Sequence, residues 1–220
     1  PLFLMLHSIS DEIVEKKGPN NSLHLKTFEQ LVIDLKAAGY HFQTATDAIE
    51  HPTHRSVVLT FDDGLIDNYT NLFPILKRHN VAATCFVTNQ GQRNKNLFLG
   101  DEHIKEMYES GLVEFGGHSS NHVFLGRISK EEATREIQEN QQRLQQLLGV
   151  PPKSFAYPSG NFTQETIEIL NALGYQYAFT MCKPLRPAKV DLYRINRQII
   201  PRGKSRFATY LLATRGKCKL

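Results

Sequence analysis

Residues 57–64 read Val-Val-Leu-Thr-Phe-Asp-Asp-Gly, an apolar run that ends in two carboxylates and a glycine. β-branched and aromatic residues favour a strand, and an unbroken apolar run is typical of a strand buried in a parallel sheet. Adjacent buried carboxylates repel each other unless a cation lies beside them. Gly64 supplies a turn that lets both side chains face one site. On its own, however, an Asp-Asp-Gly sequence is more often a helix cap or a solvated turn.

The same kind of unit recurs along the chain. Short apolar runs predict strands at 2–6, 56–61, 83–87, 113–115, 154–157 and 177–181. Amphipathic segments between them predict helices near 27–38, 67–79, 101–110, 130–148 and 163–173. Strands that alternate with helices predict an α/β fold with a mostly parallel sheet. Eight full units of a closed barrel usually take about 250 residues, so this chain predicts a smaller barrel of six or seven units. No Gly/Ser/Pro-rich linker divides residues 1–220, which predicts a single domain.

The ends of the predicted helices carry local signals. Capping-box patterns at Thr27-x-x-Gln30 and Ser129-x-x-Glu132 predict helix starts. A glycine follows each of four helix-like segments, where a left-handed residue commonly ends a helix: Gly39, Gly111, Gly149 and Gly174.

The composition is that of an ordinary globular protein, with 40% hydrophobic and 22% charged residues and a formal net charge of +4. No apolar run approaches the roughly 18 residues of a membrane span, so no transmembrane segment is expected. The apolar start at 1–6 lacks a basic flank and a cleavage site, which favours a buried strand over a signal peptide. The compartment stays open: extracytoplasmic if a leader precedes Pro1, cytoplasmic if the chain is complete.

Basic residues gather only near the end of the chain, at Arg202, Lys204, Arg206, Arg215, Lys217 and Lys219. A solvated terminus is the simpler explanation, and contact with phosphate or an anionic surface is the alternative. A nucleic-acid partner is not expected, because the chain lacks interleaved aromatic residues and any recognised motif. The cysteines, Cys85, Cys182 and Cys218, show no C-x-x-C spacing, which argues against a disulfide framework or a cysteine zinc site. Cys85 is expected in the core.

Two histidines, His118 and His122, follow another predicted strand. A spacing of four residues is common among metal ligands, although paired surface histidines are about as frequent. Ser119 is placed to orient a histidine or its carboxylate partner.

Position in the fold strengthens the case for a site. In parallel βα folds, chemistry gathers at the carboxyl ends of the strands. His7, Asp62 with Asp63, the histidine pair and the turn 157–160 all follow predicted strands. A lone histidine at a strand end is usually a packed side chain, but the coincidence at four strands favours a shared active site.

These segments resemble a known family. Thr60-Phe61-Asp62-Asp63-Gly64, His118-Ser119-x-x-His122 and Tyr157-Pro158-Ser159-Gly160 are similar to the first three motifs of the polysaccharide deacetylases, the NodB-homology or carbohydrate esterase family 4 enzymes. The similarity runs from about Val57 to Met181. It implies a distorted (β/α)7-type barrel, a divalent metal that is most often zinc, and removal of acetyl groups from N-acetylglucosamine-containing glycans.

The resemblance also implies roles for individual residues. Asp63, His118 and His122 would bind the metal, and Asp62 would be the general base. The backbone N–H of Ser159 would stabilise the oxyanion, in a substrate-binding turn with Tyr157 and Pro158.

The chain departs from the family pattern at three places. The arginine that usually opens the third motif is replaced by Ala156, the chain has no tryptophan, and no histidine follows His122. The segment Leu4-Met5-Leu6-His7 resembles the start of the biofilm-type poly-N-acetylglucosamine deacetylases, a branch with permuted motifs, which implies that His7 is the general acid. Arg194 or Arg197 is the candidate replacement for the arginine that orients the base.

Two other functions remain open from the sequence. One is a catalytically impaired glycan-binding protein on the same fold, and the other is a hydrolase of non-sugar amides. The identity of the glycan, the native metal and the oligomeric state are not predicted.

Overall fold

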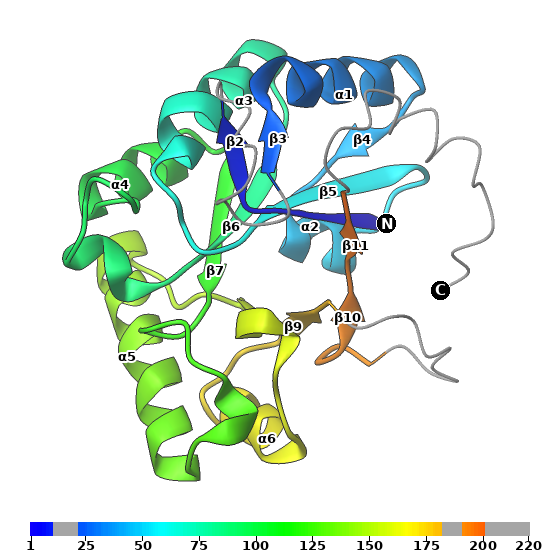
Figure 1. Cartoon of the computed structure of the whole chain (residues 1–220). Coiled ribbons are helices and arrows are strands. Elements are labelled where there is room, and N and C mark those ends of the chain that lie inside the picture. Colours follow the sequence, from blue (N-terminus) through cyan, green and yellow to red (C-terminus); the bar gives the residue numbers. More distant parts are fainter. Residues whose placement is uncertain (11–21, 182–190, 201–220) are drawn as a thin grey trace.

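The computed structural model describes residues 1–10, 22–181 and 191–200. Its centre is a sheet that curls into a nearly closed barrel with helices packed around it (Figure 1). The strand order is β10-β9-β8-β7-β6-β5-β1-β11, with β4 paired to β5. Neighbouring strands along this order run parallel. The predicted mostly parallel, distorted α/β barrel is confirmed.

The strands of the barrel are short and apolar. They are β1 (Leu2–Leu6), β4 (His41–Phe42), β5 (Ser56–Phe61), β6 (Ala83–Val87), β7 (Val113–Gly117), β8 (Ser154–Ala156), β9 (Tyr177–Thr180), β10 (Ile195–Asn196) and β11 (Gln198–Ile199). A separate parallel pair consists of β2 (Ser8–Ser10) and β3 (Ser22–His24). The helices are α1 (Leu25–Ala37), α2 (Ala45–Glu50), α3 (Phe73–His79), α4 (Asp101–Glu109), α5 (Lys130–Leu148) and α6 (Gln164–Ala172).

Most predicted elements agree with these bounds, and two details were wrong. The helix start expected at Thr27 lies at Leu25, because the side chain of His24 accepts the N–H of Lys26 and caps α1. The expected helix 67–79 is interrupted, because Asn68–Leu72 forms a π-helical turn before α3.

Other local predictions are confirmed. Ser129 caps α5 by accepting the N–H of Glu132 at 3.2 Å. The four glycines expected after helices all have a positive φ. Cys85 is fully buried. The basic residues of 202–219, Cys182 and Cys218 lie outside the described residues. Within the described ranges, no helix has the length and apolar character needed to cross a bilayer.

The pleat of the strands separates an outer core from the barrel interior. Because successive strand residues face opposite sides, Leu4 and Leu59 pack toward the helices, while Phe3 and Val58 share an interior cluster with Phe86. The same alternation carries Thr60 and Asp62 onto the interior face of β5, and His7 onto the interior face of β1 just beyond its end.

The last described strands close the barrel. β10 pairs with β9 and β11 pairs with β1, so the segment 195–199 joins the two edges of the sheet. Arg197 lies between these two strands. Its guanidinium lies 5.3 Å from the centroid of the Phe86 ring, which belongs to the interior cluster. The closing segment therefore delivers one arginine to the inside of the barrel.

Candidate active site

Three candidate metal ligands converge at the carboxyl ends of β5 and β7. One ligand atom each from Asp63, His118 and His122 lies within 4.8 Å of the others. The Nε2 atoms of His118 and His122 lie 3.4 and 3.2 Å from Oδ1 of Asp63. The convergence expected from the two motifs is therefore present.

Backbone strain brings the ligands together. Asp63 has a φ of 73° and Gly64 a φ of 70°, so the chain turns sharply after Asp62 and the two carboxylates face neighbouring positions. His122 has a φ of 57°. Non-glycine residues rarely adopt left-handed conformations, and such strain gathers at functional sites.

The tautomer of His118 is fixed by a backbone partner. Its Nδ1 lies 2.7 Å from the carbonyl oxygen of Ala156 and the ring is 1% exposed. A carbonyl only accepts, so Nδ1 carries a hydrogen and Nε2 is the ring nitrogen that faces Asp63. The first residue of the third motif thus orients a histidine with its carbonyl, although its side chain is not the usual arginine.

The donor set fits a divalent cation. Oδ1 of Asp63 is buried and has no hydrogen-bond partner among the described residues. An anionic oxygen and a neutral nitrogen lone pair that face each other repel unless a proton or a cation lies between them. Two imidazoles and one carboxylate are a ligand set of catalytic zinc sites with open positions.

The charges of the cluster shift the pKa values of its members. Burial raises the pKa of Asp63, but the rings of His118 and His122 outweigh it and hold this pKa far below its usual range. The neighbouring carboxylate of Asp63 raises the pKa of His122.

Asp62 forms a buried, two-pronged ion pair with Arg197. Nη1 donates to Oδ1 at 2.6 Å and Nη2 donates to Oδ2 at 2.7 Å, with both side chains nearly inaccessible. Nη1 also donates to the hydroxyl of Thr60 at 3.1 Å. Burial would raise the pKa of Asp62, but Arg197, His118 and His7 together hold it below the usual value. Asp62 is therefore an oriented carboxylate at neutral pH.

Arg194 lies elsewhere. Its guanidinium bonds Asp191 at 3.1 Å and Gln164 at 3.0 Å and is about half exposed. Of the two arginines proposed to orient the base, the structure brings Arg197 to Asp62.

His7 lies beside the two aspartates. Leu6 pairs with Phe61 in the sheet, and the N–H of Asp62 donates to the carbonyl of Leu6 at 3.1 Å, so His7 and Asp62 leave the sheet at the same level. Positive charge on His7 lowers the pKa of both Asp62 and Asp63. The residue expected to be the acid is thus within electrostatic reach of the expected base, Asp62, and of a candidate metal ligand, Asp63.

The third-motif turn, residues 157–160, has buried and exposed members. Tyr157 and Pro158 are buried, and Ser159 is exposed with a φ of 54°. The hydroxyl of Tyr157 donates to the carbonyl of Tyr193 at 3.0 Å. Tyr157 therefore anchors the turn, while Ser159 is its accessible member.

The sequence analysis missed the side chains that support the histidine loop. Asn140 of α5 accepts the N–H of His118 at 3.0 Å and donates to the carbonyl of Val87 and to Asn89, both at 2.9 Å. Glu136, one turn earlier, accepts the N–H of Asn121 at 2.8 Å. Both positions lie in a predicted amphipathic helix, and only their polarity among buried residues could have marked them.

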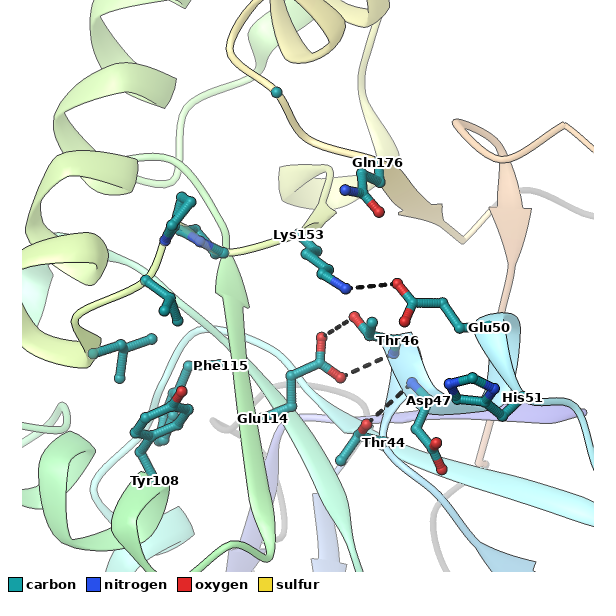
Figure 2. Close-up of a pocket in the computed structure, with 15 residues that line it drawn as sticks. Thr44, Thr46, Asp47, Glu50, His51, Tyr108, Glu114, Phe115, Lys153 and Gln176 are labelled. Atoms are coloured by element: carbon teal, nitrogen blue, oxygen red, sulfur yellow. Dashed lines mark hydrogen bonds and ion pairs between the residues drawn. The ribbon is translucent and has the colours of Figure 1, made fainter.

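A cavity of about 560 Å³ lies at the opposite end of the barrel (Figure 2). Glu114 accepts the hydroxyl of Thr46 at 2.6 Å, and Lys153 pairs with Glu50 at 2.7 Å. Glu114 and the Lys153–Glu50 pair therefore already have partners. They lie at the amino ends of the strands, where a barrel of this type is usually stabilised and not catalytic.

Comparison with known proteins agrees with this geometry. A family model described as polysaccharide deacetylase matches residues 50–178. A poly-β-1,6-N-acetyl-D-glucosamine N-deacetylase of Staphylococcus epidermidis is 30% identical over 216 residues, which cover 90% of this chain and 73% of the relative.

Two solved structures are similar over almost their whole length. The deacetylase PplD of Streptococcus pyogenes, in complex with acetate, has a TM-score of 0.85 at 28% identity and covers 97% of both chains. IcaB of Ammonifex degensii has a TM-score of 0.79 at 26% identity and covers 96% of this chain and 95% of its own. This chain belongs to the polysaccharide deacetylase family, the NodB-homology or carbohydrate esterase family 4 enzymes.

Proposed function

We propose that this protein is a metal-dependent N-deacetylase of an N-acetylhexosamine-containing glycan, most simply a polymer of N-acetylglucosamine. The observation that carries the proposal is the convergence of Asp63, His118 and His122 within 4.8 Å, directly beside the buried Asp62–Arg197 pair. In the reaction, water adds to the acetyl carbonyl carbon, the carbon–nitrogen bond breaks, and acetate and a free sugar amine form.

Zinc held by these three side chains would polarise the acetyl carbonyl and lower the pKa of water. His118 is pre-oriented for this task, because Ala156 and Asn140 hold its ring and its backbone.

Asp62 takes the proton from the attacking water. Arg197 grips both carboxylate oxygens, so Asp62 stays ionised and its orientation is fixed. The N–H of Ser159 donates to the oxygen that gains charge as water adds. One such donor typically lowers the activation barrier by about 3 kcal/mol.

His7 supplies the proton that the departing amine needs. An amine leaves as a neutral molecule only when it is protonated, so the reaction requires an acid distinct from the base. His7 is half-buried directly after β1. It follows Leu6, which pairs with Phe61, the residue before Asp62.

The substrate proposal rests on the relatives. The Staphylococcus epidermidis relative is named for poly-β-1,6-N-acetyl-D-glucosamine.

Release of acetate from oligomers of β-1,6-linked N-acetylglucosamine tests the proposal. We expect each turnover to release one acetate and to lower the mass of the oligomer by one acetyl group, with no release by Asp63→Asn. Binding of the oligomer without release would favour the glycan-binding alternative. Release only from non-sugar amides would favour the alternative amide hydrolase.

A further inference from the structure

The loop that carries Asp62 and Asp63 also contacts the segment that carries His7. Directly after Asp-Asp-Gly, the chain forms the π-helical turn Asn68–Leu72. The N–H of Phe73 bonds the carbonyl of Asn68, five residues back. Pro74 has no N–H to close an ordinary α-helical turn, which accounts for the wide turn at this place. Isolated π-helical turns occur frequently at functional sites.

Three side chains, one directly before this turn and two within it, form hydrogen bonds to residues 7–9. The side-chain amide of Asn68 donates to the carbonyl of His7 at 2.9 Å. The carboxylate of Asp67 accepts the hydroxyl of Ser8 and the N–H of Ile9. The side-chain amide of Asn71 donates to the carbonyl of Ile9 at 2.6 Å. Each residue of the segment is therefore held by at least one side chain; we call Asp67, Asn68 and Asn71 the clamp.

Asn68 is the centre of the clamp. It is completely buried, and its amide also donates to the neighbouring Asp67 at 3.0 Å, so one amide links the carboxylate of the clamp to the backbone of His7. Its own Oδ1 has no hydrogen-bond partner among the described residues. Burial of an unpaired acceptor is unfavourable, so the stabilising contribution of this side chain comes from the bonds that its NH2 group donates.

We propose that the clamp is a positioning device that sets the distance between His7 and the reacting amide. Asp62, Asp63 and the clamp belong to one short loop, so holding residues 7–9 to this loop fixes the acid relative to the base and the metal ligands. The inference rests on the proposed function, in which His7 is the general acid. A misplacement of about 1 Å can lower a rate by about 100-fold, so such a device matters for turnover.

Asn68→Leu removes the donor and keeps the branched shape and the number of heavy atoms of the side chain. Substrates with different leaving groups report its effect. Breaking the amide of an N-acetylglucosamine oligomer needs a proton from His7, whereas 4-nitrophenyl acetate releases an anion that needs none. We expect Asn68→Leu to lower acetate release from the oligomer at least about tenfold and to change ester hydrolysis less than about twofold. Gln141→Leu is the matched control, because it removes a 2.8 Å bond from a side-chain amide of α5 to the carbonyl of Leu173 at the end of α6. Both rates should stay near wild type.

A double-variant cycle separates positioning from general damage. In a His7→Ala background, Asn68→Leu should cause no further loss on the oligomer, because the acid it positions is gone. Equal losses on both substrates, or a full additional loss in the His7→Ala background, would overturn the proposal. Asn71→Ala, which removes a part-buried contact, gives the same comparison with a smaller expected loss if Asn68→Leu does not fold.

A spectroscopic readout keeps the clamp testable independently of activity. In the NMR spectrum of the histidine-labelled protein, Asn68→Leu should shift or broaden the ring signals of His7 and leave those of His51, at the other end of the barrel, unchanged. If the wild type releases no acetate, the proposed function fails while this readout still decides the clamp. A His7 signal identical in wild type and Asn68→Leu would contradict the clamp.

Discussion

Asp62 and Arg197 form a buried ion pair, in which each charge offsets the cost of removing the other from water. Replacing one partner leaves the other charge buried without compensation, which typically costs about 3–5 kcal/mol. Arg197→Met should lower the free energy of unfolding by that amount, measured by urea denaturation. The double variant Asp62→Asn/Arg197→Met should be less destabilised than the sum of the single variants. Additive effects would show that the pair contributes nothing as a pair.

Asp62 itself should be dispensable for metal binding and essential for turnover. Asp62→Asn keeps the shape of the side chain but cannot take a proton, and loss of a general base typically lowers a rate by about 100- to 10,000-fold. Zinc content and acetate release, measured on one preparation, check both halves. A variant that turns over near the wild-type rate would remove Asp62 from the role of base.

The raised pKa of Asp67 predicts that the stability of the folded protein depends on pH. Burial raises the pKa of Asp67 from 3.8 to about 6, so the folded protein holds this proton more tightly than the unfolded chain. The stabilisation is fully present below the unfolded value and is lost as pH rises through about 6. Asp67→Asn should therefore gain stability relative to the wild type between pH 4 and pH 6 and keep that gain at higher pH. Thermal unfolding of both proteins across this range is the measurement; parallel curves would contradict the shift.

At the scale of elements, α5 supports the loop that carries the two candidate histidine ligands. Asn140 fixes the backbone of His118 and ties it to β6 through Val87. Groups that orient a ligand typically change metal affinity by about 10- to 100-fold. Asn140→Leu should weaken zinc binding by that factor, measured by competition with a chelating dye. Gln141→Leu, the next residue on the same helix, should bind zinc like the wild type, and equal affinity in both variants would contradict the role of Asn140.

The sequence predicts the elements that carry a strong local pattern. The apolar runs and the helix stops at glycine locate most strands and helices, because burial and left-handed caps leave a mark in the residues themselves. The π-helical turn at Asn68–Leu72 and the short α2 leave no such mark. Their conformation depends on what the loop contacts in space, which a residue pattern does not report.

The same limit applies to the site. Strand ends and the family motifs point to Asp62, Asp63, His118 and His122, because these residues are close in sequence to buried strands. Arg197 could be predicted only as one of two candidates, since closure of the barrel decides which arginine faces inward. Asn68 and Asn140 could not be predicted, because their partners lie 61 and 22 residues away in the chain.

At the scale of the whole molecule, the candidate site lies at the carboxyl ends of the strands. The Lys153–Glu50 ion pair lies at their amino ends (Figure 2). A ligand that binds only the folded state stabilises it by about 2.7 kcal/mol when present at 100 times its dissociation constant. Zinc should therefore raise the unfolding temperature of the whole chain in a concentration-dependent way, and His118→Ala should abolish the increase. An equal increase in both proteins would place zinc elsewhere.

The central claim is that the three converging ligands bind the ion on which deacetylation depends. Its most direct test is a titration of chelator-stripped protein with zinc, in which acetate release from an N-acetylglucosamine oligomer and bound zinc are followed together. We expect no release from the stripped protein and full recovery at one zinc per chain, with neither binding nor recovery in His118→Ala. Acetate release that survives stripping, or that recovers equally in His118→Ala, would contradict it.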